Sequence, residues 1–118
     1  MEPINKRDKE EVKEFNPAGI EITNENEKAS RHNSGKPKWH LVDLESLTPL
    51  VRVLEYGAVK YEPFNWKKEM SREDILDSMM RHMVSLLSNK EIDEESKQHH
   101  IGHIMANAMF YSFHLIKN

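Results

Sequence analysis

The sequence predicts an all-α fold of three main helices, preceded by an N-terminal loop or short hairpin. Apolar residues recur every three or four positions in three stretches between residues 43 and 117, which is the period of one face of an α-helix. The first 30 residues, by contrast, are rich in Glu, Lys and Asn and hold few large apolar side chains. We therefore expect two parts, a mobile polar arm over 1–30 and a helical domain over 31–118.

The arm and the segment after it carry turn signals. A short helix is expected over Lys6–Phe15, ended by Pro17-Ala18-Gly19. Residues 31–41 should form a loop or short hairpin, because Asn33-Ser34-Gly35 favours a turn and Lys36-Pro37 favours extended backbone.

The first main helix is expected over residues 43–61, with Pro49 in its first turns, where a helix tolerates proline best. The second is expected over 71–89 behind Ser71-x-x-Asp74, which resembles a capping box. A polar connector follows. The third helix is expected over 95–117, with Asp93 as its N-cap residue.

Three helices of this length leave much apolar surface uncovered, and methionines add to it. The simplest way to bury that surface is a homodimer or higher homo-oligomer that completes a larger helical bundle. The methionines concerned are Met79, Met80, Met83, Met105 and Met109.

Composition excludes several classes of protein. The net charge is −3 and there is no basic block, which argues against binding to duplex nucleic acid. No signal peptide or membrane-length apolar run is present, so a cytoplasmic location is expected. With no cysteine, any metal would be held by His and carboxylate, which suits Mg²⁺, Mn²⁺ or Zn²⁺.

The last helix has one polar stripe. At roughly 100° per residue, His100, His103, Asn107 and His114 fall within about 60° of arc. We favour ligand binding for His100 and His103, whereas Asn107 would bind a ligand or bridge between helices, and His114 should lie at the surface, as should His99.

Candidate residues on the first two helices each have a structural alternative. Glu55 flanks an apolar stripe and is either a metal ligand or a surface carboxylate. Lys60 ends its helix and could simply complement the helix dipole. His82 is either a core residue or a ligand, and Arg81 binds either Asp77 or a phosphate.

Three loop residues complete the candidates. Lys36 follows a glycine and could bind phosphate as a point charge, although no P-loop is present. Trp39 and Trp66 could stack on a base or cover the edge of the core. No Ser-His-Asp or Cys-His arrangement is visible, so covalent catalysis is not expected.

The stretch from Arg31 to Tyr111 resembles the small, often phage-encoded family of dATP/dGTP diphosphohydrolases, placed near the all-α MazG-like nucleotide pyrophosphohydrolases. The residues that carry the resemblance are Arg31-x-Asn33-x-Gly35-Lys36-Pro37-x-Trp39, Leu54-Glu55-Tyr56-Gly57-Ala58-x-Lys60-Tyr61, Asn65-Trp66, Arg81-His82, Glu91-Ile92-Asp93-x-Glu95-Ser96 and His100-x-x-His103-x-x-x-Asn107-Ala108.

The resemblance implies metal-dependent hydrolysis of a purine (deoxy)nucleoside triphosphate to the monophosphate and pyrophosphate. It implies a divalent ion, Mg²⁺ or Mn²⁺ with Zn²⁺ as a further candidate, and three catalytic groups, Glu55, Asp93 and His103. The implied metal ligands are Glu55, His82, Asp93 and His103. Phosphate would be bound by Lys36, Lys60, Arg81 and His100, and base or sugar by Trp39, Asn65, Trp66 or Asn107.

The sequence departs from the MazG-like pattern of E-x-x-E on one helix and E-x-x-D on a later one. Ala58 stands three residues after Glu55, and His100 and His103 stand where an acidic pair is expected. Glu91-x-x-Glu94 has the spacing but lies in the connector. Fewer carboxylates imply a different metal set or no catalysis, so a module that binds a nucleotide, such as a signalling nucleotide, without hydrolysing it is the alternative function.

Overall fold

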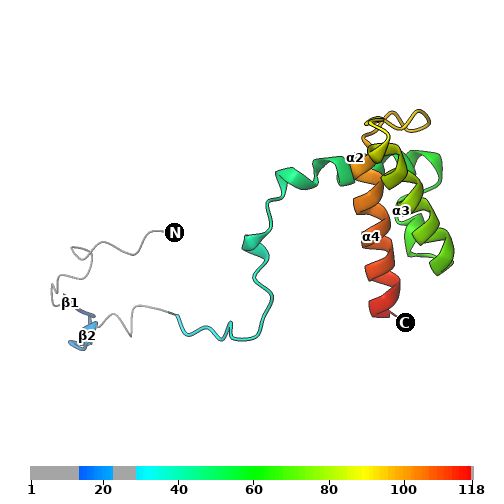
Figure 1. Ribbon diagram of the computed structural model, residues 1–118. Helices are drawn as coiled ribbons and strands as arrows, with labels where there is room; N and C mark the ends of the chain where they lie inside the picture. The colour runs from blue at the N-terminus through cyan, green and yellow to red at the C-terminus, as the bar shows by residue number, and fades with distance from the viewer. Residues whose placement is uncertain (1–13, 23–28, 118) are drawn as a thin grey trace. The chain divides into compact units, whose positions relative to one another are not determined.

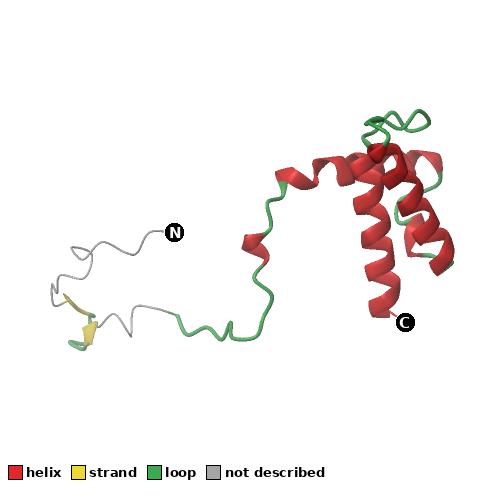
Figure 2. Cartoon of the chain, in the orientation of Figure 1, coloured by secondary structure: helices red, strands yellow, loops and turns green. Residues whose placement is uncertain are grey.

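The computed structural model describes residues 14–22 and 29–117, and the chain divides into two units, Met1–Lys38 and Trp39–Asn118. Each unit is described by itself. The first contains a two-stranded antiparallel hairpin of β1 (Glu14–Phe15) and β2 (Glu21–Ile22) (Figure 2).

The hairpin corrects the helix expected over Lys6–Phe15, of which only the last two residues are described. The Oδ1 atom of Asn16 accepts hydrogen bonds from the backbone N–H groups of Ala18 and Ile20, each at 3.0 Å. Gly19 has a φ of +80°, so the chain reverses here. A local side-chain hydrogen bond therefore favours a turn and flanking strands over a helix end.

The loop expected over residues 31–41 is confirmed for its first part. The N–H of Lys36 donates to the carbonyl of Asn33 at 3.2 Å, and Gly35 has a φ of +78°. The loop ends in the 3-10 helix η2 (Trp39–Leu41), and no hairpin forms between residues 31 and 41.

The second unit is all-helical, as predicted, with three main helices: α2 (Thr48–Lys60), α3 (Arg72–Leu87) and α4 (His100–Lys117) (Figure 1). Helix α4 packs against both α2 and α3. The face of α4 that lies between α2 and α3 therefore borders any cavity between those two helices.

Helix α2 starts later than expected because of Pro49. A proline lacks the N–H group and its ring clashes with the preceding turn, so an α-helix begins close to it. The residues before it form the separate 3-10 helix η3 (Glu45–Leu47), and the Thr48 hydroxyl donates to the Glu45 carbonyl at 2.7 Å.

Helix α3 has the N-cap that the sequence predicted. The Ser71 hydroxyl accepts a hydrogen bond from the backbone N–H of Asp74 at 3.4 Å. Glu73 and Asp74 place negative charge in the first turn, where the helix dipole favours it.

Helix α4 begins at His100, not at residue 95, because the connector makes its own turn. The N–H of Asp93 donates to the Gln98 carbonyl and the N–H of Lys97 donates to the Asp93 carbonyl, both at 2.8 Å. The Asp93 carboxylate accepts from the N–H of Ser96 and so closes this turn instead of capping α4. The connector thus folds back toward the start of α4.

The core of the second unit is small. Among the described residues, the buried apolar side chains are Val53, Ile75 and Ala106, one from each main helix. At the crossing of α2 and α4, a Cβ atom on Gly102 would lie 2.8 Å from the Pro49 carbonyl carbon. Glycine therefore lets these helices approach closely. No helix in the described ranges has the length and hydropathy to cross a membrane.

Candidate functional site

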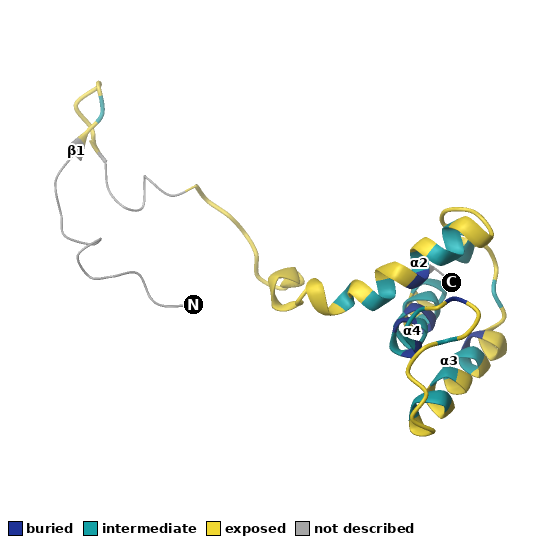
Figure 3. Cartoon of the chain, turned by 90° about the horizontal axis from the view of Figure 1, so that it is seen from above, coloured by how far each residue is buried: buried dark blue, intermediate teal, exposed yellow. Residues whose placement is uncertain are grey.

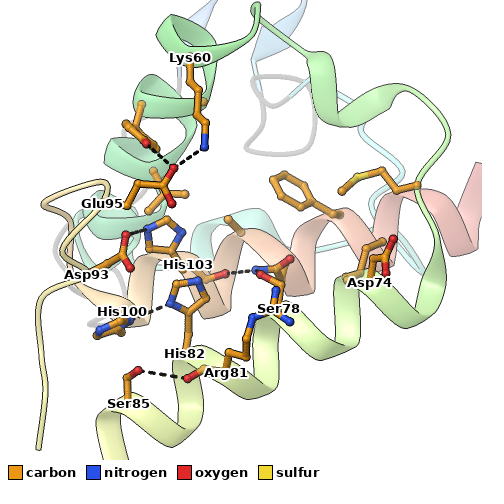
Figure 4. Close-up of a pocket in the computed structure, with 18 of the residues that line it drawn as sticks. Lys60, Asp74, Ser78, Arg81, His82, Ser85, Asp93, Glu95, His100 and His103 are labelled. Atoms are coloured by element: carbon orange, nitrogen blue, oxygen red, sulfur yellow. Dashed lines mark hydrogen bonds and ion pairs between the residues drawn. The ribbon is translucent and has the colours of Figure 1, made fainter.

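A cavity of the second unit lies between α2 and α3, above the inward face of α4 (Figure 4). Its volume is about 590 Å³. The polar stripe of α4 lies inside the bundle: His100 and Asn107 are only 6% and 7% exposed. Figure 3 colours the buried residues of α4 dark blue. The stripe predicted from sequence thus faces the cavity and the neighbouring helices.

Three imidazoles gather on one wall of the cavity. The Nδ1 atoms of His82 on α3 and His100 on α4 lie 2.8 Å apart. The His103 ring stacks on the His82 ring, with centroids 4.2 Å apart and planes 4° from parallel. His100 and His103 share one face of α4 because they are three residues apart, and the packing of α3 against α4 brings His82 beside them.

The connector brings a carboxylate to the same place. The Asp93 Oδ2 atom accepts hydrogen bonds from the Ser96 N–H at 2.9 Å and the Ser96 hydroxyl at 2.8 Å. It also lies 3.6 Å from His103 Nε2, which is itself 2.6 Å from the Ser96 hydroxyl. Ser96 is buried, so these contacts fix the carboxylate against the histidines.

The surroundings favour the neutral forms of His82 and His103 and the ionised form of Asp93. Burial, together with the neighbouring His103 and His100 rings, lowers the pKa of His82 to about 4. Burial likewise lowers the pKa of His103, against the opposing effect of Asp93. Burial acts to raise the pKa of Asp93, but the two hydrogen bonds from Ser96 outweigh it, and the net pKa is lowered.

Cations line the other parts of the cavity. Lys60, at the end of α2, forms an ion pair with Glu95 of the connector, and the Tyr56 hydroxyl donates to the same carboxylate at 3.2 Å. Glu95 raises the pKa of Lys60, and Lys60 in turn lowers the pKa of Glu95. Arg81, from α3, lines the cavity as a second cation.

Three of these groups have the arrangement of a metal-binding set. One ligand atom from each of His82, Asp93 and His100 can be chosen so that all lie within 4.8 Å of one another. Two imidazole nitrogens and a carboxylate oxygen are donors that divalent transition metals accept.

The structure brings most of the predicted site residues together around this cavity. Those that line it are Lys60, Arg81, His82, Asp93, His100, His103 and Asn107. Asn107 also bridges helices, as the structural alternative anticipated: its Nδ2 donates to the Ser78 hydroxyl at 3.2 Å and to the His103 carbonyl at 2.8 Å.

Other predicted residues lie elsewhere. Glu55 is exposed on α2, where it pairs with Arg52 at 3.0 Å, and does not line the cavity. Trp39 is 79% exposed in η2 and does not line it either. Lys36 belongs to the first unit.

Two further predicted residues line a smaller cavity of about 130 Å³ at the end of α2. They are Asn65 and Trp66, in the 3-10 helix η4 (Asn65–Lys67). The Trp66 ring stacks on Phe110 with centroids 5.6 Å apart and meets the edge of Phe113 at 5.1 Å, so it covers the edge of the core.

Sequence reasoning left some residues out. Tyr56 and Glu95 line the cavity, and Ser96 holds Asp93, yet none was a candidate. Tyr56 lies one helical turn before Lys60, so the two share a helix face, and this spacing could have identified Tyr56 from the sequence. His114, expected at the surface, is half-buried, and its Nε2 lies 2.8 Å from the Trp66 carbonyl.

Comparison with known proteins identifies the family. The family model described as dATP/dGTP diphosphohydrolase, N-terminal, matches residues 26–118. The chain belongs to this family. The resemblance read from the sequence is thereby confirmed at the level of the dATP/dGTP diphosphohydrolase family, whereas its placement near MazG-like enzymes stays a prediction.

One relative is a dATP/dGTP diphosphohydrolase of Salmonella phage PMBT28. It is 32% identical over 88 residues, which are 75% of this chain and 30% of that protein. The chain therefore spans less than a third of the relative's length. No solved structure matches the chain.

Proposed function

We propose that this chain hydrolyses a purine deoxynucleoside triphosphate to the monophosphate and pyrophosphate in the cavity between α2 and α3. The observation that carries the proposal is the combination of a histidine–aspartate cluster with two cations around one cavity. Membership in the dATP/dGTP diphosphohydrolase family and the name of the phage relative support the reaction class.

The cavity suits a triphosphate in size and charge. Its volume of about 590 Å³ is typical of small-molecule sites. Lys60 comes from α2 and Arg81 from α3, so a phosphate chain between them would be bound from both sides. A guanidinium can bind two phosphate oxygens at once, whereas an ammonium acts as a point charge.

A divalent metal fits the residues present. His82, Asp93 and His100 offer two imidazole nitrogens and a carboxylate oxygen toward one point, and a lowered pKa keeps His82 neutral at pH 7. When bound, the ion would neutralise phosphate charge and polarise the attacking water. This set shares His82 and Asp93 with the predicted ligands; His100 replaces His103, and Glu55 is left out.

The proposed reaction attacks the α-phosphorus of the nucleotide. The oxygen of a water molecule forms a bond to this phosphorus, the bond to the bridging oxygen breaks, and pyrophosphate leaves with that oxygen. We assign the proton of the water to His103, which lines the cavity and whose pKa is lowered by burial. A neutral imidazole can accept a proton at pH 7.

A module that only binds nucleotide is the alternative that the sequence left open. It would use the same cations but yield no product. The relative's name favours hydrolysis and offers nothing in support of sequestration. We also propose a cytoplasmic location, in the host if a phage encodes the chain, because the substrate is found there.

We further propose that the chain forms a homo-oligomer. The outward side of α3 exposes apolar residues at the spacing of one helical face, and such a patch is a typical protein interface. These residues are Met80, Met83, Val84 and Leu87. Light scattering should give a mass above that of one chain, and Leu87→Lys should shift it toward the monomer; a monomeric parent chain would refute the assembly.

The test of the catalytic proposal is turnover by matched variants. Asp93→Asn and Arg81→Met should each reduce turnover of dATP or dGTP by at least about 100-fold, since metal and phosphate contacts are worth several kcal/mol in a transition state. Asp77→Asn, on the exposed side of α3, is the control and should retain activity. Equal turnover in all three variants would contradict the proposed site.

A further inference from the structure

The donor atoms of the His82–Asp93–His100 set carry an inference about which ion it selects. We infer that this set is a site for a late first-row transition-metal dication of the Co²⁺ or Zn²⁺ class, and that it discriminates against Mg²⁺. The inference rests on the proposed function only in placing a metal in the same cavity.

The first argument is the chemistry of the ligands. Mg²⁺ is a hard ion that prefers oxygen ligands in octahedral geometry, whereas imidazole nitrogen suits the later first-row transition metals. Two of the three groups that converge here are imidazoles. Asp93 alone supplies oxygen, which leaves Mg²⁺ with one preferred protein ligand.

The second argument is geometry. The His82 and His100 Nδ1 atoms are 2.8 Å apart, so the same nitrogen of each ring lies close to the other. Two nitrogens bound to one ion at about 2.1 Å each lie roughly 3 Å apart when their bonds are perpendicular. The observed separation is close to this value.

The third argument is that the groups are held in place. His100 is buried and begins α4, and His82 is covered by the parallel ring of His103. Two hydrogen bonds from Ser96 orient Asp93. Hydrogen bonds and packing contacts around metal ligands orient them and increase the affinity for the metal. The cavity on the open side leaves room for water or phosphate oxygens as the remaining ligands.

The experiment is a metal titration of the full chain after chelator treatment and dialysis. Calorimetry with CoCl₂, ZnCl₂ and MgCl₂ should give one ion per chain, with Kd values for Co²⁺ and Zn²⁺ at least about tenfold below that for Mg²⁺. Bound Co²⁺ should show the visible absorption of a nitrogen-ligated ion. This readout does not depend on activity.

Variants test whether the ion binds where we infer. His82→Gln and His100→Gln should lose the tight transition-metal binding, while His40→Gln, an exposed histidine in η2, should keep it. Circular dichroism checks that each variant is folded. His82→Asp, which exchanges nitrogen for oxygen, should narrow the difference in Kd between Co²⁺ and Mg²⁺.

Three results would overturn the inference: no metal binding by the folded parent chain, Mg²⁺ binding as tightly as Co²⁺, or Co²⁺ binding unchanged in both glutamine variants. Hydrolysis with Mg²⁺ and no transition-metal preference would overturn it while leaving the proposed function intact. Tight Co²⁺ binding without turnover of any nucleotide would support the inference and overturn the proposed function.

Discussion

The Nδ1 atom of His82 lies 2.8 Å from the Nδ1 atom of His100 and joins the middle of α3 to the first residue of α4. Two protonated imidazoles would direct N–H groups at each other across this distance, so at least one ring must be neutral. The parallel His103 ring, 4.2 Å from His82, adds a third group that disfavours positive charge. The lowered pKa of His82 keeps this imidazole neutral at pH 7, and a neutral imidazole can bind metal or accept a proton.

Stability should fall in acid because of His82. Its pKa is about 4 in the folded chain against an ordinary value of 6.5, so the unfolded chain binds more protons between these values. The contribution is fully present above about pH 6.5 and is lost as the pH falls toward 4. Thermal unfolding of metal-free protein across this range should show a falling Tm. His82→Gln should reduce the slope; an unchanged slope would contradict this assignment.

Replacing Gly102 should separate α2 from α4. An added Cβ would lie 2.8 Å from the Pro49 carbonyl carbon and 2.9 Å from Val53 Cγ2, and a backbone group cannot move aside easily. We expect Gly102→Ala to lower the free energy of unfolding, although alanine is favoured over glycine in a helix by about 1 kcal/mol.

Gly57→Ala is the matched control for this change. Gly57 is also helical, and its added Cβ would meet no atom within 4 Å. Urea unfolding should therefore show a gain of roughly 0.5–1 kcal/mol for this variant. If both alanine variants were stabilised equally, the close crossing at Gly102 would be refuted.

Ser96 should act through Asp93. Its N–H and hydroxyl hold the carboxylate, and the hydroxyl also contacts His103. Ser96→Ala removes the hydroxyl that contacts two half-buried side chains and should cost about 1–3 kcal/mol of stability. It should also weaken metal binding by about 10- to 100-fold. Ser88→Ala, at an exposed position after α3, should change neither quantity in unfolding and metal titrations.

Glu95 should compete with phosphate for Lys60. The two side chains form an ion pair at the cavity, so a bound triphosphate must share or replace the carboxylate. Glu95→Gln should tighten binding of a non-hydrolysable triphosphate, by at most about fivefold because the pair is largely exposed. Glu94→Gln removes the same charge from an exposed neighbour that does not line the cavity. Equal effects in both variants would show only a general charge effect.

The helices could be predicted from sequence because apolar periodicity reports the packing of each helix face. The first residue of α3 could also be predicted, from its capping serine, but the first residues of α2 and α4 could not, because local interactions set them. Pro49 delays α2, and the side chain of Asp93 closes a turn within the connector, so α4 begins five residues later than expected. Such competition between side-chain and helical hydrogen bonds is decided by the surrounding structure.

The candidate site, too, could be predicted from the sequence only in part. The spacing of His100 and His103 on one helix was visible in the sequence, and the structure places both at the cavity. Glu55 was chosen by analogy with an acidic pattern, whereas Glu95 is the glutamate that lines the cavity. Nothing in the sequence shows how far the connector folds back, so its contribution required the structure.

The most direct test of the central claim is to identify the products of the full chain incubated with dATP and dGTP and with Mn²⁺, Co²⁺ or Mg²⁺. We expect deoxynucleoside monophosphate and pyrophosphate in equal amounts, resolved by chromatography, with label from ¹⁸O-water in the monophosphate. Diphosphate with orthophosphate, or label in the pyrophosphate, would contradict attack at the α-phosphorus. No product from folded, metal-loaded protein that still binds the nucleotide would contradict hydrolysis itself.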